Sequence, residues 1–419
     1  MSSPIIFRPL GHHTLEPVTI ERAPLLIREL RSFLTAPRLA AALATYRMRV
    51  EKDHDIRVIR MQDSQPLIEG FIQFDRMTFQ GRRKLKRLTP EIAALANIAA
   101  MLQFVIPSFD SATRTQHIDR LLSLNGQLRP LLLEWKTAAH VARNKGAQLA
   151  WLPSKGKSLP EFIARVDGVE FDLECKRPTP MVTQRLGDTE ADEVAAAIMR
   201  GARERDLQGR LTLDVTNDVI TEKGGLRDDI AKPLLEHLKA GAVDTKLPSG
   251  VHLSGALAPQ TTRWFDRDLW LASVGYFQRQ VANARVYSNA EANGEQVGNA
   301  VTLRLIAPIK SPDELAKDLW ELKFKKAASQ CTGERGAILV FEWESVTDPT
   351  IFADTHIFQQ MAASTFTEFP HVSRIVMRCD SEPESEGGLI HFDVKVYTVE
   401  NVQARFPEVC RFMRIEAPL

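Results

Sequence analysis

The sequence predicts an α/β fold in which helices flank a mixed central sheet. An Asp-Gly pair between two short apolar runs predicts a β-hairpin over residues 162–176. Segments of helical and strand periodicity alternate on both sides of this hairpin. The chain has 419 residues, of which 44% are hydrophobic and 26% charged, as in ordinary globular proteins. This length is enough for two or three domains or one elaborated domain.

Residues 1–105 predict an N-terminal α/β domain. Helices are expected at Pro24–Leu34 and Pro37–Tyr46, because proline is favoured at the first helical position. Arg57–Met61 and Leu67–Phe74 are expected to be short strands. A longer helix over residues 90–105 has a threonine before it as N-cap, and its apolar stretch is too short for a membrane span.

The run Arg82–Arg87 places five cations in six residues just before that helix. Cations gain nothing near a helix N-terminus, where the helix dipole favours anions. The run therefore has two interpretations: it contacts phosphate groups, or it is a solvated loop.

The middle of the chain predicts a helix, three strands, a second helix and a further strand. The first helix, Arg129–Asn144, has apolar residues at helical spacing and is followed by Gly146, a good C-terminal stop. The other elements are a strand at Ala147–Leu152, the two strands of the hairpin, a helix at Glu190–Arg205 and a strand at Leu211–Thr216.

Residues 220–298 interrupt this pattern and are expected to form an insertion. It contains a short helix at Ile230–Ala240, a strand near Val251–Ala256 and a polar loop at Ser288–Asn299. Regular alternation resumes at Val301–Ile306. A capping box at residues 311–314 then starts a helix, and the remaining predicted strands are Gly336–Phe341, Ser373–Arg378 and Leu389–Tyr397.

The hairpin has chemical significance because its turn fixes the pairing of its strands. Asp167 and Gly168 suit the two loop residues of a type I′ turn. The turn pairs Val166 with Val169, Ala164 with Phe171 and Glu161 with Glu174. Because opposed carboxylates repel each other, a divalent cation between Glu161 and Glu174 would explain this acid pair.

The period of two in a strand places Asp172, Glu174 and Lys176 on one face, and Phe171, Leu173 and Cys175 on the other. One face is therefore expected to pack and the other to carry the charged groups beside Glu161. Oxygen ligands suit Mg²⁺, which usually takes one or two carboxylates and several waters. A lysine beside such a site can orient or deprotonate a water, or stabilise charge on a phosphate.

This arrangement resembles the PD-(D/E)xK nuclease superfamily, which carries an acid on one strand and acid-x-Lys on the next. Glu161 corresponds to the first acid, although that position more often holds Asp, Glu174 to the second acid and Lys176 to the lysine. Members of the superfamily often bring a further acid from the preceding helix, and Glu134 is the residue placed there. The resemblance implies a restriction-endonuclease-like core at about residues 127–217 and 300–400, within a nuclease-like domain of residues 106–419.

The resemblance further implies a metal-dependent nuclease that hydrolyses phosphodiester bonds, with DNA favoured over RNA as substrate. Glu161 and Glu174, with Glu134 left open as a further ligand, would hold one or two Mg²⁺ or Mn²⁺ ions. Lys176 and Glu134 would complete the catalytic residues. Large additions around a small nuclease core favour, by analogy, restriction or antiviral defence. Two alternatives stay open: a plain hairpin with a solvated acidic face, and a catalytically silent nuclease fold that serves as a scaffold or binding module.

Composition excludes several other classes of protein. The net charge of +1 gives no overall attraction to nucleic acid, so phosphate binding must come from local patches. Four scattered cysteines indicate reduced thiols and a cytoplasmic location. No membrane partner is expected, and a homo-oligomer or a partner protein is left open. The sequence lacks the motifs of P-loop ATPases, Rossmann enzymes, zinc hydrolases and nucleophile-elbow hydrolases.

Overall fold

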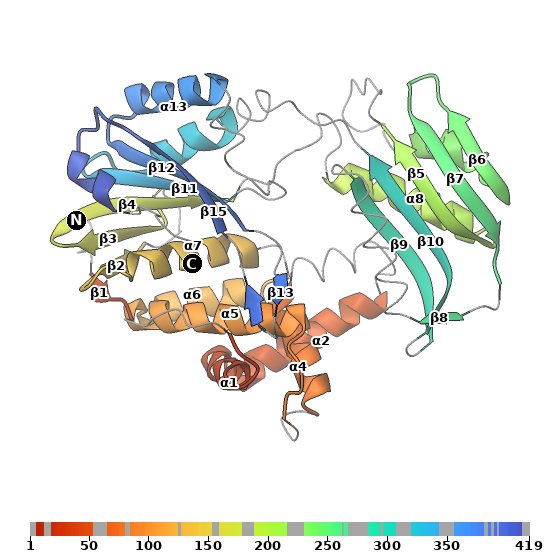
Figure 1. Ribbon diagram of the computed structural model, residues 1–419, viewed down its shortest axis with the longest axis horizontal. Coiled ribbons are helices and arrows are strands. Elements are labelled where there is room, and N and C mark those ends of the chain that lie inside the picture. The colour runs from red at the N-terminus through yellow and green to blue at the C-terminus, as the bar shows by residue number, and fades with distance from the viewer. Residues whose placement is uncertain are drawn as a thin grey trace. The chain divides into compact units, whose positions relative to one another are not determined.

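The described part of the chain forms two compact units, each with its own mixed sheet flanked by helices (Figure 1). Unit 1 comprises Met1–Tyr46, Gln62–Pro180 and Pro312–Leu419, and unit 2 comprises Arg47–Met61 and Met181–Ser311. The protein is therefore mixed α/β. The computed structural model describes residues 6–11, 18–52, 65–79, 84–124, 127–152, 159–177, 188–215, 230–261, 264–266, 284–293, 296–306, 320–342, 356–380, 384–386, 389–391 and 394–412.

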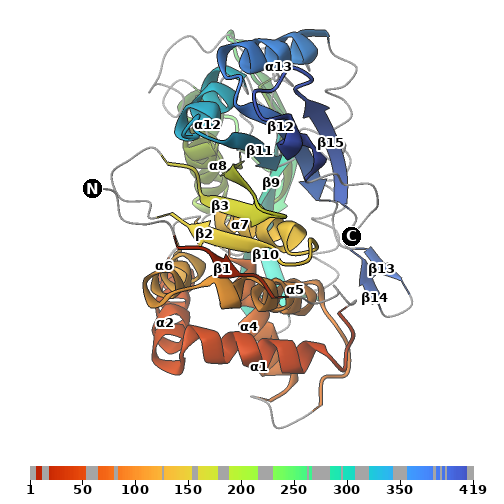
Figure 2. The same cartoon turned by 90° about the vertical axis from the view of Figure 1, so that its left-hand side faces the viewer.

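Unit 1 contains a seven-stranded sheet in the order β1-β2-β3-β4-β11-β12-β15 (Figure 2). The pairs β4–β11 and β11–β12 are parallel, and the other neighbours are antiparallel. The strands are β1 (Arg8–Pro9), β2 (Gln148–Trp151), β3 (Phe162–Val166), β4 (Val169–Lys176), β11 (Gly336–Glu342), β12 (Val372–Asp380) and β15 (Val394–Glu400), with a separate pair formed by β13 (Glu384–Glu386) and β14 (Leu389–His391).

Helices cover both faces of this sheet. Ala337, Leu339 and Phe341 of β11 pack with α12 and α13 on one face. Cys175 of β4 donates to Thr137 of α7 at 3.5 Å on the other face. The helical elements of unit 1 are α1 (Ala23–Leu34), α2 (Ala36–Lys52, in unit 1 as far as Tyr46), α4 (Pro66–Met77), α5 (Pro90–Val105), η1 (Ile106–Ser108), α6 (Ser111–Leu122), α7 (Leu128–Val141), η3 (Trp320–Phe324), α12 (Lys325–Gln330), α13 (His356–Glu368) and η5 (Pro407–Arg411).

The hairpin formed by β3 and β4 has the predicted register. Val166 pairs with Val169, and Ala164 pairs with Phe171. Asp167 and Gly168 have φ angles of 50° and 78°, the positive values that a type I′ turn requires. The Asp-Gly pair therefore sets the register of the two strands locally.

Several features of the N-terminal region bear on the sequence predictions. The expected strand at Leu67–Phe74 is wrong, because these residues form α4, whose buried side chains follow helical spacing. Thr89 caps α5 as predicted, accepting a hydrogen bond from the Ile92 N–H.

Pro90–Ser108 is the one helix in the described segments that is long and apolar enough to cross a membrane, and 61% of its apolar window is buried, as in the core helix of a soluble protein. The expected strand at Arg57–Met61 lies outside the described residues.

Unit 2 contains a six-stranded sheet with the order β6-β7-β5-β10-β8, in which β9 also pairs with β10. Leu211 and Leu213 of β5 and Val194 and Ile198 of α8 belong to its core. Its elements are α8 (Asp188–Arg203), β5 (Leu207–Asp214), α9 (Lys232–Leu235), β6 (Gly241–Lys246), β7 (His252–Pro259), β8 (Trp264–Asp266), β9 (Ala284–Asn293) and β10 (Gln296–Ile306).

Unit 2 differs from the insertion expected at residues 220–298. The predicted helix Glu190–Arg205 and strand Leu211–Thr216 form as α8 and β5, but β5 pairs with β7 and β10 and not with the hairpin. The expected loop at Ser288–Asn299 is wrong: β9 and β10 form most of that segment, because their residues pair with each other in a long antiparallel ladder. The segment of unit 2 that separates β4 from β11 therefore begins near Met181.

Candidate active site

Glu161, Glu174 and Lys176 lie together where β3 begins and β4 ends. The backbone N–H of Glu161 donates to Oε2 of Glu174 at 3.1 Å. Lys176 Nζ lies 4.0 Å from Oε1 of Glu161 and forms a closer ion pair with Oε1 of Glu174. The ladder ends at Phe162 and Leu173, one residue before the predicted pair of Glu161 and Glu174, and both carboxylates lie near one ammonium group.

The three side chains differ in their exposure to solvent. Glu174 is fully buried, whereas the side chains of Glu161 and Lys176 are 28% and 21% exposed. Glu174 is buried because β11 pairs alongside β4, opposite β3, and because α12 packs on β4. The plain hairpin with a solvated acidic face is therefore wrong, and a ligand from solvent would meet Glu161 and Lys176 first.

The pKa values of both Glu174 and Lys176 are raised, but for different reasons. Burial raises the pKa of Glu174 to about 8, with a further contribution from the Glu161 carboxylate, while Lys176 opposes the shift. Burial alone would lower the pKa of Lys176, but the carboxylates of Glu174 and Glu161 outweigh it and the pKa is raised. The Lys176 ammonium therefore stays charged. The raised pKa of Glu174 is the effect expected of a buried acid that lies near a second carboxylate.

Glu134 lies on α7 within the electrostatic influence of this group, since the charges of Glu161 and Lys176 both act on its pKa. Burial and Glu161 raise that pKa, whereas Arg120 lowers it. Both oxygens of Glu134 accept hydrogen bonds from the Arg120 guanidinium, at 2.5 Å and 2.7 Å. The sequence analysis did not identify Arg120, which lies on α6 outside the resemblance.

A second contact, one helical turn from Arg120, joins α6 to α7. The indole N–H of Trp135 donates to Nδ1 of His117 at 3.1 Å, so the ring proton of the neutral imidazole is on Nε2. Burial lowers the pKa of His117 to about 3, which keeps the ring neutral. Phe109 and Trp151 contact the same ring edge-on, with centroids 4.5 Å and 4.7 Å away. These contacts fix α6, and with it Arg120, against α7.

Asp172 shares a strand face with Glu174 but has a different environment. One of its oxygens accepts from the backbone N–H and the hydroxyl of Thr332, at 2.8 Å and 3.0 Å. The other lies 3.4 Å from Nε of Arg335. Asp172 therefore anchors the turn after α12, a structural role that the period of two could not distinguish from ligand binding.

The lysines of η3 and α12 and the cations before α5 lie in different environments. Lys323 is half-buried, and burial together with the charges of Lys326 and Lys176 lowers its pKa. Lys325 forms a 2.8 Å ion pair with Glu368. In the run of cations before α5, the described residues Lys84, Lys86 and Arg87 are exposed and lie in irregular backbone.

The residues of the site have the right chemistry for Mg²⁺ but are engaged with cations. Carboxylate oxygens are the donors that Mg²⁺ takes, and a partly exposed Glu161 leaves room for waters. Throughout the described residues, no three His, Cys, Asp or Glu side chains are grouped so that they could hold a metal ion. Instead, each of the two buried carboxylates faces a cation: Lys176 at Glu174 and Arg120 at Glu134.

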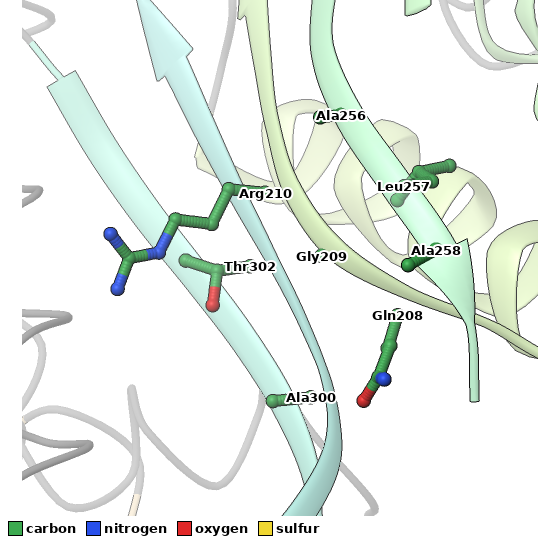
Figure 3. A pocket seen from close by; sticks show the side chains of 8 residues that line it. All are labelled: Gln208, Gly209, Arg210, Ala256, Leu257, Ala258, Ala300 and Thr302. Atoms are coloured by element: carbon green, nitrogen blue, oxygen red, sulfur yellow. The ribbon is translucent and has the colours of Figure 1, made fainter. Parts of the chain in front are cut away.

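Unit 2 contains a pocket of about 340 Å³ on its sheet (Figure 3). Its lining includes no acidic side chain, and Arg210 is the one charged residue in it, so it lacks the groups that the chemistry above needs. The lining residues are Gln208, Gly209, Arg210, Ala256, Leu257, Ala258, Ala300 and Thr302.

Comparisons of the chain with protein families, with curated proteins and with solved structures gave no match.

Proposed function

We propose that the protein is a metal-dependent nuclease, most simply a DNA endonuclease, with a restriction-endonuclease-like core in unit 1. The observation that carries this proposal is the convergence of Glu161 and Glu174 on Lys176 at the end of β4. The order α7, β2, β3, β4, with β11 added in parallel to β4, supports the same core. DNA as substrate and a role in restriction or antiviral defence follow from the resemblance alone.

Each residue has a defined part in this proposal. Glu161 and Glu174 would hold Mg²⁺ or Mn²⁺, which supplies a Lewis acid for the phosphate and a more acidic water. Lys176, charged and partly exposed, would position that water and stabilise negative charge on the phosphate. Glu134 would act behind them, with its charge compensated by Arg120. Cys175 and Cys331 are buried cysteines outside any disulfide, which supports a reducing cytoplasmic location.

A cleavage assay tests the activity. The parent protein should cut DNA with Mg²⁺ and lose this activity with EDTA. Lys176→Ala should reduce cleavage about 100-fold or more, because a positioned acid or base contributes about that much. Lys145→Ala, an exposed lysine after α7, is the matched control and should cut like the parent. Cleavage by Lys176→Ala at the parent rate would rule out the assigned site.

Melting curves test the metal site without relying on activity. Glu174→Gln replaces a buried acid whose ionised form burial disfavours, keeps the shape of the side chain and retains an acceptor for the Glu161 N–H. The metal-free variant should therefore be as stable as the parent or slightly more stable, and Mg²⁺ should no longer raise its melting temperature. Glu170→Gln, on the same hairpin and paired with Arg165, should keep the Mg²⁺ effect. A parent indifferent to millimolar Mg²⁺ and Mn²⁺ would contradict the proposal.

A second candidate is a nuclease fold without catalysis, serving as a scaffold for a partner protein or for nucleic acid. The lack of a preformed group of three ligands among the described residues favours it. The two candidates differ in metal binding: calorimetry with Mn²⁺ should detect an ion in the nuclease and none in the scaffold. No ion and no cleavage of single- or double-stranded DNA or RNA would select the scaffold.

A further inference from the structure

Arg120 forms a hydrogen-bonded ion pair with both carboxylate oxygens of Glu134. Its Nη1 and Nη2 atoms donate to the two oxygens in a bidentate arrangement, at 2.7 Å and 2.5 Å. The Glu134 side chain is 3% exposed and that of Arg120 is 19% exposed. A bidentate pair of this kind is directional and strong, and a second cation at Glu134 would have to bind beside the fixed positive charge of the guanidinium.

The position of Arg120 is fixed by the neighbouring contact between the same two helices. His117 lies one turn before Arg120 on α6 and accepts the indole N–H of Trp135, the residue after Glu134 on α7. The aromatic rings of Phe109 and Trp151 enclose the imidazole. These contacts hold α6 against α7, while the guanidinium itself is held by its two hydrogen bonds to Glu134, and it keeps its charge at any physiological pH.

With Glu134 paired to Arg120, the carboxylates that remain for a divalent cation are those of Glu161 and Glu174. Glu134, Glu161 and Glu174 are acidic, and Arg120 and Lys176 are basic. Of the two basic groups, Lys176 lies beside Glu161 and Glu174, and its flexible ammonium can shift towards a phosphate. Glu134 alone has a rigid partner.

We propose that Arg120 is a positioning residue that serves as a fixed counterion in place of a second divalent ion at Glu134, so that the site takes one divalent ion, on Glu161 and Glu174. This inference rests on the proposed metal-dependent function and specifies its metal count. It also assigns a role to α6, which the nuclease-like pattern of the sequence does not include.

Calorimetric titration with Mn²⁺ tests the inference on the full chain. The parent should bind one ion. Arg120→Met removes the guanidinium but keeps a long side chain, and it should bind a second ion or bind the first about tenfold more tightly, because one positive charge is lost nearby. Arg120→Lys keeps the charge and should remain at one ion with the parent affinity.

Two further variants keep the test decisive if Arg120→Met fails to fold with an unpaired buried Glu134. Arg120→Met combined with Glu134→Gln leaves no buried charge at this point and should bind one ion. Glu134→Gln alone should also bind one ion, with an affinity within about tenfold of the parent, since Glu134 is not a ligand. Loss of the ion in either variant would overturn the inference.

The outcomes separate the inference from the proposed function. A parent that binds no Mn²⁺ contradicts the proposed function and removes the basis of the inference. A parent that binds two ions contradicts the inference alone. A parent with one ion, together with a folded Arg120→Met variant that has the same stoichiometry and affinity, shows that Arg120 does not set the metal count.

Discussion

At the scale of single residues, the two buried acids of β4 show how partners decide the use of a side chain. Asp172 and Glu174 point to the same face and are both fully buried. Thr332 and Arg335 engage the oxygens of Asp172, and the turn after α12 is thereby anchored. Glu174 instead faces Lys176 two residues later and the N–H of Glu161. Only Glu174 is thus placed beside a partly exposed carboxylate and ammonium.

Lys323 provides a prediction at this scale. Its pKa is lowered by burial and by the charges of Lys326 and Lys176, so a bound phosphate would relieve repulsion between cations. Lys323→Ala should weaken DNA binding and reduce the slope of log K against log salt by about 1. Fluorescence anisotropy at several salt concentrations measures both quantities.

The control for this prediction is Lys325→Ala, because that ammonium is already paired with Glu368. It should leave the salt dependence close to that of the parent. An equal effect of both substitutions would show that the helix face binds DNA without a specific role for Lys323.

At the scale of elements, Glu342 joins four segments of unit 1. It lies at the end of β11 and accepts from Lys136 of α7 and from Nε of Arg177, which follows β4, each at 2.9 Å. Nε of Arg378 in β12 lies 3.7 Å away. Burial would raise the pKa of Glu342, but these three cations outweigh it and hold the pKa at about 2.

In the same network the pKa of Lys136 is lowered, mainly because this lysine is buried. Burial lowers the pKa of Lys136 to about 8, and Arg378 and Arg177 repel its charge while Glu342 opposes the shift. Glu342 thus has three cationic neighbours, whereas Lys136 shares this one carboxylate with Arg177 and Arg378. Glu342 is therefore the member whose charge the fold requires most.

Glu342→Gln should lower the free energy of unfolding by about 3–5 kcal/mol at pH 7, because it leaves a cluster of buried cations without their carboxylate. The folded pKa of Glu342, about 2, is below its ordinary value of 4.5. Its contribution should be complete above about pH 5 and be lost as the pH falls from about 4.5 to about 2. Urea unfolding of the parent and the variant at pH 7, 5 and 3.5 measures this, and the difference between them should shrink at low pH.

Glu334→Gln is the control for this series, since the Glu334 side chain is 81% exposed. It should change stability by less than about 0.5 kcal/mol at every pH. A Glu342→Gln variant as stable as the parent would show that the network contributes nothing to the fold.

At the scale of the whole molecule, the order of strands separates sequence neighbours. The parallel partners β4 and β11 are separated along the chain by the second unit, and each unit has a sheet and a core of its own. In unit 2, β5 and β7 approach closely at Gly209 and Gly255, which pair with Leu257 and Leu211, since a Cβ at Gly255 would lie 2.2 Å from the Arg210 carbonyl oxygen. The core of unit 2 therefore depends on a position far in sequence from the candidate active site.

Gly255→Ala tests the independence of the two units. The clash is with backbone and the φ angle is +143°, so β7 must move away from β5. Hydrogen exchange measured by mass spectrometry should become faster in β5 and β7 and stay unchanged in β4 and β11. Ala258→Ser, an exposed position on β7, should leave both regions as in the parent. Faster exchange in β4 and β11 would show that the two cores are coupled.

The sequence by itself determined the local features of the site. The Asp-Gly turn set the register of the hairpin, and the period of two placed Glu174 and Lys176 on one face, because both depend on residues close in the chain. The helix α7 and the strands β4 and β11 were predictable for the same reason.

Only the tertiary structure decided which of these elements meet. Leu67–Phe74 form a helix because they pack in the core of unit 1, and β5 pairs in unit 2 because its partners lie there. The burial of Glu174 depends on β11 and α12, and the neutralisation of Glu134 depends on Arg120 of α6. Side-chain burial and ion pairing between distant segments follow from long-range packing, which the periodicity of a single segment does not contain.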